Sequence, residues 1–593
     1  SKEVRMPILN STLIIIACFL PLFFLSGMEG RMLIPLGIAF IVALFASTIV
    51  ALTLTPVMSS YMLTTKKALK KSEKEPYVSR VLKKAYKRAL SQALSHKKIV
   101  LGITGGLFIF SLIVMLNLGR SFLPPFNEGS LTINISTMPG ISLEESDRMG
   151  LITEKILMDI PEIQTVARKT GRAELDEHAL GVNVSEIEAP FVLDKRSRDE
   201  FLADVRQQLG TLKGVNVEIG QPISHRIDAM LSGTKANIAI KLFGNDLNKL
   251  FNLGTQIKQA IQDIDGIADL NVEQQIERPQ LQIKPKRDIL AKYGITLPQF
   301  SEFVNVALSG KVVSQVNEGG KVFDLTVKIN DVNRENMEAI GNLMLDANGK
   351  NVPLHYVAEI LPLSGPNTIS RENVQRKIVV SANVAGRDLK GVVNDIQKEV
   401  GEKISLPEGY HIEYGGQFES EQAASRILFL TSLISLLIIF LILYHEFRNL
   451  SLSGIIMLNL PLAIIGGIIS IWITSGVISI PAIIGFISLF GIATRNGILL
   501  VSHYNQLRSE GCSLKESILQ GSLDRLNPIL MTALTSALAL IPLAVGGSLP
   551  GNEIQSPMAQ VILGGLLSST LLNGFVIPVV YQLLNRKKEI VKE

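Results

Sequence analysis

The sequence has little cysteine and few aromatic residues. Its 593 residues include two cysteines, Cys18 and Cys512, which lie far apart in or beside apolar segments and show no C-x-x-C spacing. This pattern indicates neither a disulfide framework nor a cysteine zinc site. Aromatic residues make up 6% of the chain, which argues mildly against the aromatic, apolar cleft expected for drug-sized ligands.

Signatures of enzymes are also missing. The sequence has no Walker loop, no dinucleotide fingerprint and no recognisable pairing of a nucleophile with a base. We therefore expect neither an ATPase nor a hydrolase, and no bound cofactor. The formal net charge of +5 does not point to nucleic acid, because the excess of lysine and arginine lies in short segments beside apolar runs, as in the cytoplasmic loops of membrane proteins.

What the chain has in abundance is long apolar runs. Hydrophobic residues make up 47% of the sequence, and their grouping predicts eight membrane-spanning helices. The predicted spans are 7–26, 33–63, 99–118, 427–444, 453–474, 480–504, 528–545 and 558–584. Eight crossings return the chain to the side of the membrane on which it starts.

Segment 65–98 is strongly basic, which predicts a cytoplasmic location. Within it, 78–94 has apolar residues at helical spacing and is predicted to lie as an amphipathic helix on the membrane surface, in contact with membrane lipids. A solvated basic face is favoured here over an electrostatic regulatory switch.

The stretch from 119 to about 425 contains no apolar run of spanning length, and we expect a soluble domain outside the membrane. Strands and amphipathic helices alternate in it twice in the same order, which predicts tandem split βαβ units. The first unit uses strands 131–137, 182–188 and 215–219 with helix 143–159. The second begins with strand 238–243 and helix 246–263, and is completed by strand 377–384, helix 389–400 and strand 411–414, after an insertion.

The span 480–504 contains Arg495, with Asn496 beside it. An arginine at the centre of a lipid-facing helix costs about 2.5 to 3.5 kcal/mol, so we expect Arg495 to face a polar interior shared by several helices. The alternative is that Arg495 lies near the cytoplasmic end and that its guanidinium reaches the headgroups. Every Asp and Glu of the membrane portions lies in a connection or at a span end.

Eight short strings run through the chain: LIIIACFLPLFFLSGMEGR (13–31), LPPFNEGSL (123–131), KTGRAELDEHA (169–179), HRIDAMLSG (225–233), YGGQFE (414–419), GIATRNGILL (491–500), NPILMTALTSAL (527–538) and NEIQSPMAQVILGGL (552–566). In this order and with this topology, the chain resembles the resistance-nodulation-division (RND) exporters of Gram-negative inner membranes. Within them it is most similar to the heavy-metal efflux branch.

The resemblance implies the C-terminal half of such a permease. Its fold class would be an α-helical membrane bundle of eight transmembrane helices with a large α+β periplasmic insertion of split βαβ, ferredoxin-like porter subdomains. The implied division is 1–64, helices five and six; 65–98, cytoplasmic basic linker; 99–118, helix seven; 119–235, first porter subdomain; 236–425, second porter subdomain with a docking insertion at about 288–362; 426–593, helices eight to twelve.

The resemblance also implies a function and partners. The chain would belong to a proton antiporter that exports divalent cations such as Zn(II), Co(II), Cd(II) or Ni(II) as part of a tripartite system. Its implied partners are the missing N-terminal half, a periplasmic adaptor, an outer-membrane channel and two further copies in a homotrimer.

A proton relay is implied at Arg495, with its neighbour Asn496, and at Arg525 and Thr532. In the family these positions pair with aspartates of helix four, which lie in the missing half. Protonation of the aspartates would release the pairing and shift a two-state helix arrangement.

A thioether metal site of the copper and silver type is not expected, because Asn134, Val184 and Ala229 stand at the positions of its methionines. Borderline ligands for divalent metals occur instead, and they include Glu174 and His225, the latter in a stretch that could converge with the others across a cleft. The candidate metal ligands are Asp176, Glu177, His178, Glu186, Glu188 and Asp228. The alternative is that these are ordinary solvated side chains of the domain surface.

Two other functions remain open from the sequence. One is a drug or amphiphile exporter of the same fold. The other is a membrane-anchored subunit that does not transport by itself.

Overall fold

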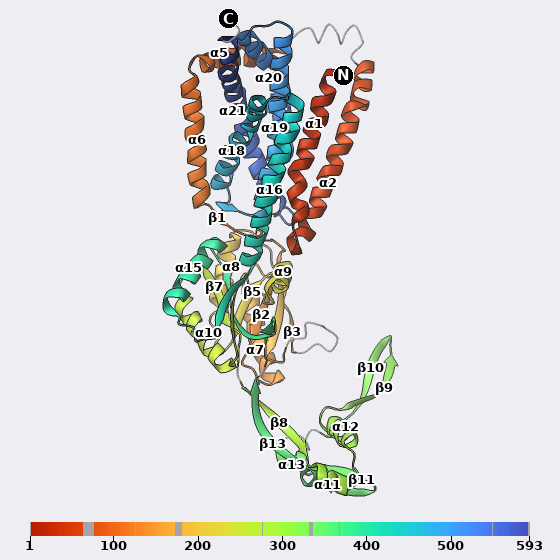
Figure 1. Cartoon of the computed structure of the whole chain (residues 1–593). Helices are drawn as coiled ribbons and strands as arrows, with labels where there is room; N and C mark the ends of the chain where they lie inside the picture. The colour runs from red at the N-terminus through yellow and green to blue at the C-terminus, as the bar shows by residue number, and fades with distance from the viewer. Residues whose placement is uncertain are drawn as a thin grey trace.

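A computed structural model of the chain describes residues 2–62, 76–124, 126–171, 181–275, 277–330, 336–366, 368–547 and 549–590. Figure 1 shows three parts stacked along one axis: a helical bundle, an α+β block and an elongated β-rich arm. Both ends of the chain lie at the end of the bundle that is far from the block. We call this the far end of the bundle.

The bundle consists of long helices before and after the α+β block. Before the block come α1 (Lys2–Phe19), η1 (Leu20–Phe24), α2 (Gly27–Leu52), α3 (Leu54–Met62), α5 (Tyr77–Ser95) and α6 (Lys97–Asn117). After it come α16 (Gln417–Phe447), α17 (Leu450–Met457), α18 (Asn459–Ile473), α19 (Ile480–Ser509), α20 (Leu514–Val545) and α21 (Gln555–Ile590).

Among the described residues, seven helical segments are long and apolar enough to cross a membrane, against the eight spans that the sequence predicts. The difference lies in the first predicted span, where α1 passes into η1 at Leu20 and the apolar helix, Leu9–Phe24, is short. The span predicted at 427–444 is part of a longer helix, because α16 begins at Gln417. The predicted domain boundary at 425 therefore falls inside α16.

Close contacts between small residues hold α18 against α21. A Cβ added at Gly466 would lie 2.1 Å from the carbonyl oxygen of Gly564, and Ser568 Oγ donates to the carbonyl of Leu462 at 2.8 Å. Small residues let the two backbones approach in this way, which is how many membrane helices pack. The result is a tightly fixed central pair.

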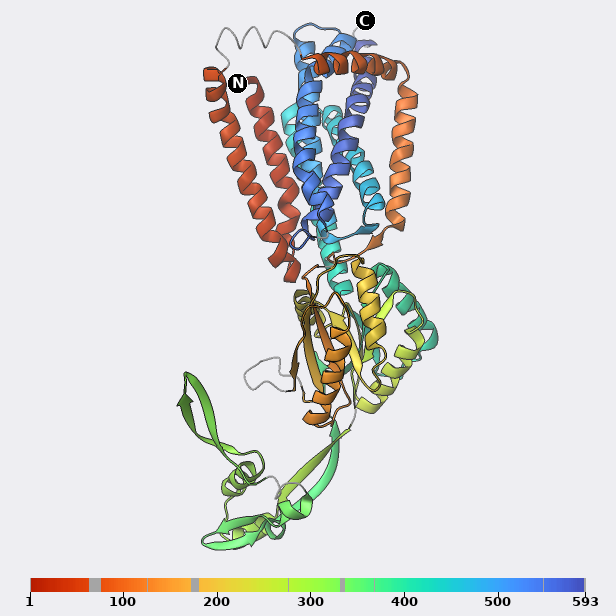
Figure 2. The ribbon, with the colours of Figure 1, turned by 180° about the vertical axis from the view of Figure 1, so that it is seen from behind.

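The predicted surface helix is α5, which lies across the far end of the bundle beside α6 and α20 (Figure 2). Its buried side holds Leu90 and Leu94. Tyr86 Oη donates to the carbonyl of Gly574 in α21 at 2.5 Å, and Asn527 of α20 donates to Ser79 Oγ at 2.7 Å. These contacts fix α5 on the bundle.

The first subdomain of the block is a four-stranded antiparallel sheet covered by helices. Its elements are β2 (Ser130–Ser136), α7 (Leu143–Met158), β3 (Ala167–Thr170), β4 (Val184–Pro190), α8 (Arg198–Leu209) and β5 (Asn216–Gly220). The strand order β3-β4-β2-β5 is that of a split βαβ unit. A further helix, α9 (Pro222–Ser232), follows the sheet.

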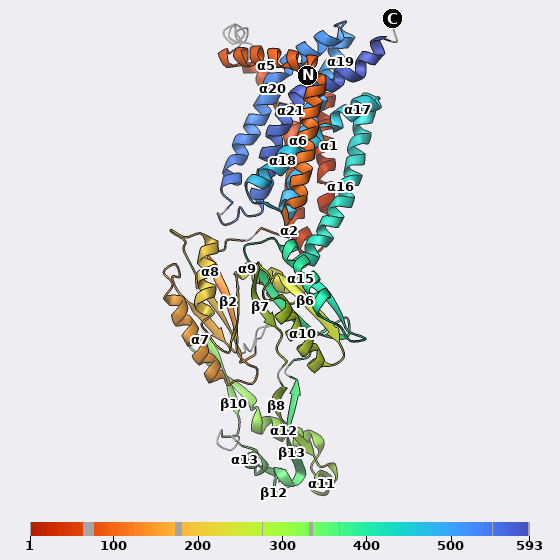
Figure 3. The same cartoon turned by 90° about the vertical axis from the view of Figure 1, so that its left-hand side faces the viewer.

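The second subdomain repeats this plan. Its elements are β6 (Ile238–Gly244), α10 (Leu247–Ile261), β7 (Ile267–Val272), β14 (Arg371–Glu372), β15 (Gln375–Val384), α15 (Leu389–Lys403) and β16 (His411–Gly416). Strand β15 pairs with β6 and with β7, and β6 pairs with β16. Figure 3 shows the two subdomains side by side under the bundle.

The arm is inserted between β7 and β15. It begins with β8 (Glu277–Pro285) and ends with β13 (Ala358–Pro366), and these two strands form one antiparallel ribbon. The predicted insertion, 288–362, is thus too narrow, because it leaves out most of the ribbon. Between the strands lie α11 (Arg287–Lys292), α12 (Leu297–Leu308), β9 (Lys311–Glu318), β10 (Lys321–Val327), α13 (Met337–Gly341), β11 (Met344–Ala347), β12 (Lys350–Pro353) and α14 (Leu354–Val357).

The two subdomains are joined at their sheet edges by side chains. Arg206 of α8 donates from Nε and a terminal nitrogen to the carboxylate of Asp269 in β7, at 3.2 Å each. Asn383 of β15 donates to the same carboxylate at 2.8 Å and to the carbonyl of Ile219 in β5 at 3.3 Å. We call Arg206, Asp269 and Asn383 the seam clasp.

The block is tied to the bundle by a short parallel pair of strands, β1 (Gly119–Arg120) and β17 (Val477–Ile478). Helix α16 makes a second connection, because it continues directly from β16 into the bundle.

Candidate functional site

Arg495 lies on the face of α19 that packs against α1. The residue one turn before it, Gly491, is so close to α1 that an added Cβ would lie 2.9 Å from Ile15. Arg495 is half-buried, and the described residues provide it with no hydrogen bond or ion pair. The expectation that it faces the helix interior agrees with this position, while its counter-charge is not found in the described part of the chain.

The register between α19 and α20 sets the height of Thr532. The two helices are antiparallel neighbours, and His503 Nε2 lies 3.2 Å from Asp524 Oδ2. Arg495 and Thr532 are each eight residues away from that pair, on the side toward the α+β block. They therefore stand level with each other along the bundle axis, about 12 Å from the pair. Arg525 stands about 10 Å closer to the far end of the bundle than Thr532. The structure thus brings Thr532 level with Arg495 and places Arg525 closer to the end of the bundle.

Helix α21 runs parallel to α19 and adds polar groups at the same height. Tyr581 Oη donates to Asn505 Oδ1 at 2.7 Å, which fixes an offset of 76 residues between the two helices. That offset places Thr570 and Asn573 level with Thr494 and Gly497.

Asn459 of α18 completes this set, because an added Cβ at Gly497 would lie 2.1 Å from its amide nitrogen. Within the described ranges, Asn459 Oδ1, Thr570 Oγ1 and both amide atoms of Asn573 are buried without a hydrogen-bond partner. Unpaired polar atoms at this depth are costly, and they mark a place where water or a partner helix is needed. We call the set the polar layer; it comprises Asn459, Thr494, Arg495, Asn496, Thr532, Thr570 and Asn573.

The sequence analysis missed Asn459, Thr570 and Asn573. A signal for two of them existed, since each asparagine interrupts an otherwise apolar run. Glu29, Glu446 and Glu553 lie at helix ends or in a connection, as predicted, whereas Asp524 lies in the third turn of α20, near the far end.

A second polar site lies on the first subdomain. The sheet face opposite the apolar core carries Thr132, Asn134, Glu186 and Glu188, because residues two apart on a strand point the same way and β2 pairs with β4. Glu188 accepts a hydrogen bond from Thr132 Oγ1 at 2.9 Å. The two predicted ligands Glu186 and Glu188 therefore share one face.

Glu186 is held by two lysines. Lys169 and Lys235 place their ammonium groups 2.7 and 2.8 Å from its carboxylate oxygens. Burial by itself would raise the pKa of Glu186, but the hydrogen bonds and charges of the lysines lower it to about 2. Lys235 also donates to Asn134 Oδ1 at 2.9 Å. The Lys235 ammonium thus occupies the place that a cation would take between these oxygens.

His225 of α9 stands next to this group. Its Nδ1 lies 3.2 Å from the amide nitrogen of Asn134, and its ring packs so closely on Gly220 that no side chain would fit there. Burial, and secondarily the charge of Lys235, lower the pKa of His225 to about 4, so the imidazole is neutral at pH 7. Its Nε2 is buried against Gly220 with no hydrogen-bond partner among the described residues, so a metal ion would reach this nitrogen only after the ring moves away from Gly220.

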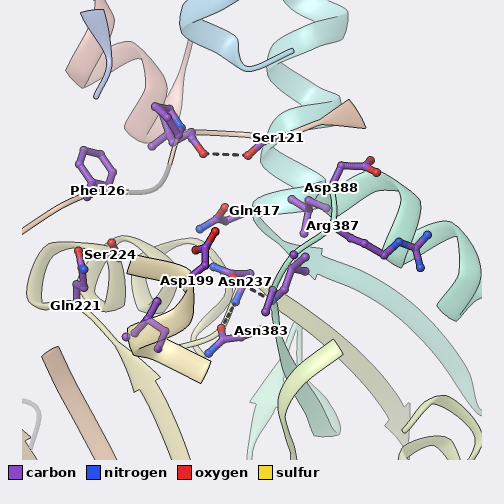
Figure 4. Close-up of a pocket in the computed structure, with 18 of the residues that line it drawn as sticks. Ser121, Phe126, Asp199, Gln221, Ser224, Asn237, Asn383, Arg387, Asp388 and Gln417 are labelled. Atoms are coloured by element: carbon purple, nitrogen blue, oxygen red, sulfur yellow. Dashed lines mark hydrogen bonds between the residues drawn. The ribbon is translucent and has the colours of Figure 1, made fainter. Parts of the chain in front are cut away.

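Asp228, one turn later on α9, faces a cavity of about 980 Å³ between the block and the bundle. Gln417 and Asn237 donate to its carboxylate at 2.7 and 3.2 Å. Burial raises the pKa of Asp228 to about 7, against these hydrogen bonds. In Figure 4, Gln417 lies above Asn237 and Asn383, which share a hydrogen bond.

The other predicted ligands, Asp176, Glu177 and His178, lie outside the described residues, as does Glu174. Within the part of the chain that is described, no three His, Cys, Asp or Glu side chains stand close enough to hold a metal ion. The metal site therefore stays a prediction. The structure adds Asn134 and Lys235 to the residues that concern it.

Comparison with known proteins gives a consistent set of relatives. The chain is 33% identical to the cobalt-zinc-cadmium resistance protein CzcA of Cupriavidus metallidurans, over 99% of this chain and 56% of that protein. It is 30% identical to the nickel-cobalt-cadmium resistance protein NccA of Alcaligenes xylosoxydans xylosoxydans, over 100% and 56%. A crystal structure of a heavy metal efflux pump is similar with a TM-score of 0.83 and 28% identity, over 98% of this chain and 58% of that one.

The chain thus spans a little over half the length of the relatives it matches. The model of the AcrB/AcrD/AcrF family matches residues 1–585. With a family match over nearly the whole chain and a fold shared with a pump of that kind, this chain belongs to the AcrB/AcrD/AcrF family of RND permeases.

Proposed function

We propose that this chain is the C-terminal half of an RND permease that exports divalent heavy-metal cations in exchange for protons. The cations would be of the Zn(II), Co(II), Cd(II) or Ni(II) type. Resistance to such metals is in the printed names of CzcA and NccA.

The observation that carries the proposal is the state of Arg495. It is a half-buried cation in a polar layer whose buried atoms lack partners, and the described helices place no carboxylate at that height. A guanidinium in this position needs an acidic counterpart. A carboxylate whose protonation makes and breaks that pairing would couple proton entry to helix position.

Helix α20 indicates where the counterpart would come from. None of the most apolar 18-residue stretch of α20 is buried, against 67% for α19. The exposed stripe follows one face of the helix: Met531, Leu534, Leu538, Ile541 and Val545. A helix that carries Thr532 at the polar layer and exposes so much apolar surface suits packing against further helices, which an N-terminal half would supply.

The metal would bind at the polar site of the first subdomain, beside the cavity between the block and the bundle. Neutral imidazole and carboxylate are borderline ligands that suit Zn(II), Co(II) and Ni(II). His225, Asp228 and Glu186 are the described side chains that we assign to this role, with Glu188 beside them. Asp176, Glu177 and His178 would add ligands from the preceding loop.

A metal ion would have to displace Lys235 from Glu186, because the ammonium occupies the space between the oxygens. Such competition favours labile binding by two or three groups, and release matters as much as capture for a transporter.

The proposed location is the inner membrane of a Gram-negative bacterium. The block and arm would face the periplasm, and α5 the cytoplasm. An adaptor, an outer-membrane channel and two further copies of the permease would complete the assembly.

Transport in liposomes tests the proposal. The chain, co-expressed with an N-terminal half that carries acidic residues on its fourth helix, should export Zn(II) from vesicles with an inward proton gradient, whereas the chain alone should not. Arg495→Met should abolish exchange, and Thr474→Val, an exposed change at the other end of the bundle, should not. If both halves together form a complex but move no metal, a non-transporting subunit is the better description.

Metal binding by the intact chain tests the cleft. Calorimetry with Zn(II) should give a signal that His225→Ala and a Glu177→Ala, His178→Ala double variant each weaken. Glu145→Ala, on the exposed face of α7, is the matched control. A drug exporter predicts instead no metal signal and binding of amphiphiles, although among the residues that line the cavity Phe126 is the single aromatic one described.

A further inference from the structure

The far end of the bundle holds a histidine and a carboxylate that the proposed metal and relay sites do not use. His503 is in the penultimate turns of α19, and Asp524 is in the third turn of α20. Their side chains meet with Nε2 and Oδ2 3.2 Å apart. Gln520 donates to the other oxygen of Asp524 at 2.9 Å and orients the carboxylate.

The two nitrogens of His503 face different surroundings. Nδ1 is buried, and the described residues give it no hydrogen-bond partner. Nε2 contacts a carboxylate whose side chain is 38% exposed, while the side chain of His503 is 16% exposed. One imidazole therefore connects the interior of the bundle with a group that water can reach. An imidazole is also the side chain whose ordinary pKa allows proton exchange near neutral pH.

The pair stands between the polar layer and the far end, on the side of α19 that faces α20. By the antiparallel register, His503 and Asp524 are about 12 Å above Arg495 and Thr532. Asn527 of α20 stands between the two levels and donates to Ser79 Oγ of α5 at 2.7 Å, while Tyr504 and Ser522, which share a hydrogen bond at 2.5 Å, stand just beyond the pair toward the far end. A proton that leaves the layer along α19 and α20 would meet His503 before it reaches solvent.

We propose that His503 and Asp524 form the proton exit of this permease at the cytoplasmic end of α19 and α20; this rests on the proposed proton-driven function. A proton arrives from the interior on Nδ1 of the neutral imidazole, which becomes imidazolium. The proton on Nε2 passes to the Asp524 carboxylate and from there to water. The ring, now neutral and protonated on Nδ1, returns to its starting state by rotation and proton exchange with solvent.

Other titratable groups surround the pair. Arg508 and Arg525 lie on the same two helices. Tyr581 of α21 contacts Asn505, and Tyr86 of α5 lies in contact with Ser522. None of them joins a buried atom to an exposed carboxylate in the way that His503 does among the described residues of this end.

Chemical rescue distinguishes a relay from a structural contact. In vesicles with the complete permease, His503→Ala should slow proton-coupled Zn(II) exchange about tenfold or more. Imidazole added on the α5 side of the membrane should restore most of the rate, because a diffusible base can carry the proton in place of the missing ring. His445 is an exposed histidine at the same end. The His445→Ala variant should exchange at the wild-type rate, and imidazole should not increase that rate. Asp524→Asn should also be slow.

The outcomes separate the two proposals. Wild-type vesicles that exchange no protons for metal overturn the proposed function, and the exit with it. Wild-type exchange with an unimpaired His503→Ala variant overturns the exit alone. The exit is also overturned if His503→Ala is slow, imidazole does not restore its rate, and its thermal unfolding matches that of the wild type. If the unfolding of His503→Ala differs from the wild type, the same assay is done with His503→Gln, which keeps a hydrogen bond to Asp524.

Discussion

The seam clasp should control how far the two subdomains open. The Asp269 carboxylate, 7% exposed, accepts two hydrogen bonds from Arg206 and one from Asn383. Breaking a fully buried ion pair costs about 3 to 5 kcal/mol, but the Arg206 side chain is 25% exposed. We therefore expect Asp269→Asn to favour the open arrangement by about 2 kcal/mol, a shift of about 30-fold in the closed-to-open ratio. Asparagine tolerates the positive φ of 51° at this position, so the backbone should persist.

Electron spin distances can measure this shift. Labels on the exposed residues Gln207 of α8 and Lys398 of α15 report the separation of the subdomains, after Cys18 and Cys512 are replaced by serine. The wild type should give one narrow distance, and Asp269→Asn a second, longer one.

The matched control for this experiment is Glu145→Gln, which removes an exposed pair with Arg148 on α7 and should change the ratio by less than about 0.5 kcal/mol. Identical distance distributions for the wild type and Asp269→Asn would refute the reasoning that the clasp limits opening.

Three further outcomes follow from the described contacts. The pKa of Glu186 is lowered from 4.5 to about 2, so the wild type should unfold at a higher temperature than Glu186→Gln at pH 7. This difference in Tm should disappear as the pH falls from about 4.5 to about 2. An equal difference in Tm at pH 7 and pH 2 would contradict the reasoning. Gly466→Ala should destabilise the bundle by about 1 to 3 kcal/mol, since its Cβ meets a carbonyl oxygen at 2.1 Å, whereas Gly454→Ala, with no atom within 4 Å, should be neutral or stabilising in the same thermal assay. Ser197→Ala should lose the capping box of α8 and cost about 1 kcal/mol, seen as faster amide exchange in its first turn.

Much of the fold could be predicted because its signals are local. Apolar runs predicted the bundle helices, and the strands and helices predicted for the two subdomains lie within a few residues of their observed positions, but β3, α8 and α9 of the first subdomain were not predicted. The arm is the exception: β8 and β13 pair across at least 72 intervening residues between Pro285 and Ala358, and a ribbon formed at such a separation leaves little trace in either strand alone. The sequence did not predict the start of α16 for a different reason, since most of its first ten residues are polar and carry no membrane signal.

The sites depended more on packing. Arg495 could be found because a cation in an apolar run is costly wherever it points. Asn134 and Lys235 could not, because their importance comes from a strand register and an ion pair with Glu186 that bring together residues 101 positions apart. The sequence gives no signal for His503, since its partner Asp524 lies on the next helix.

Helix α16 is one long helix that links the α+β block to the far end of the bundle. Its 31 residues extend from Gln417, which binds Asp228 beneath the bundle, to Phe447 at the far end, where Asn10 donates to Glu446. At 1.5 Å per residue it is about 46 Å long. A tilt of about 5° about one end would displace the other by about 4 Å, which is enough to exchange one hydrogen-bond partner for another. Because α16 is one continuous helix, a movement of its membrane part would also move Gln417 and change its hydrogen bond to Asp228.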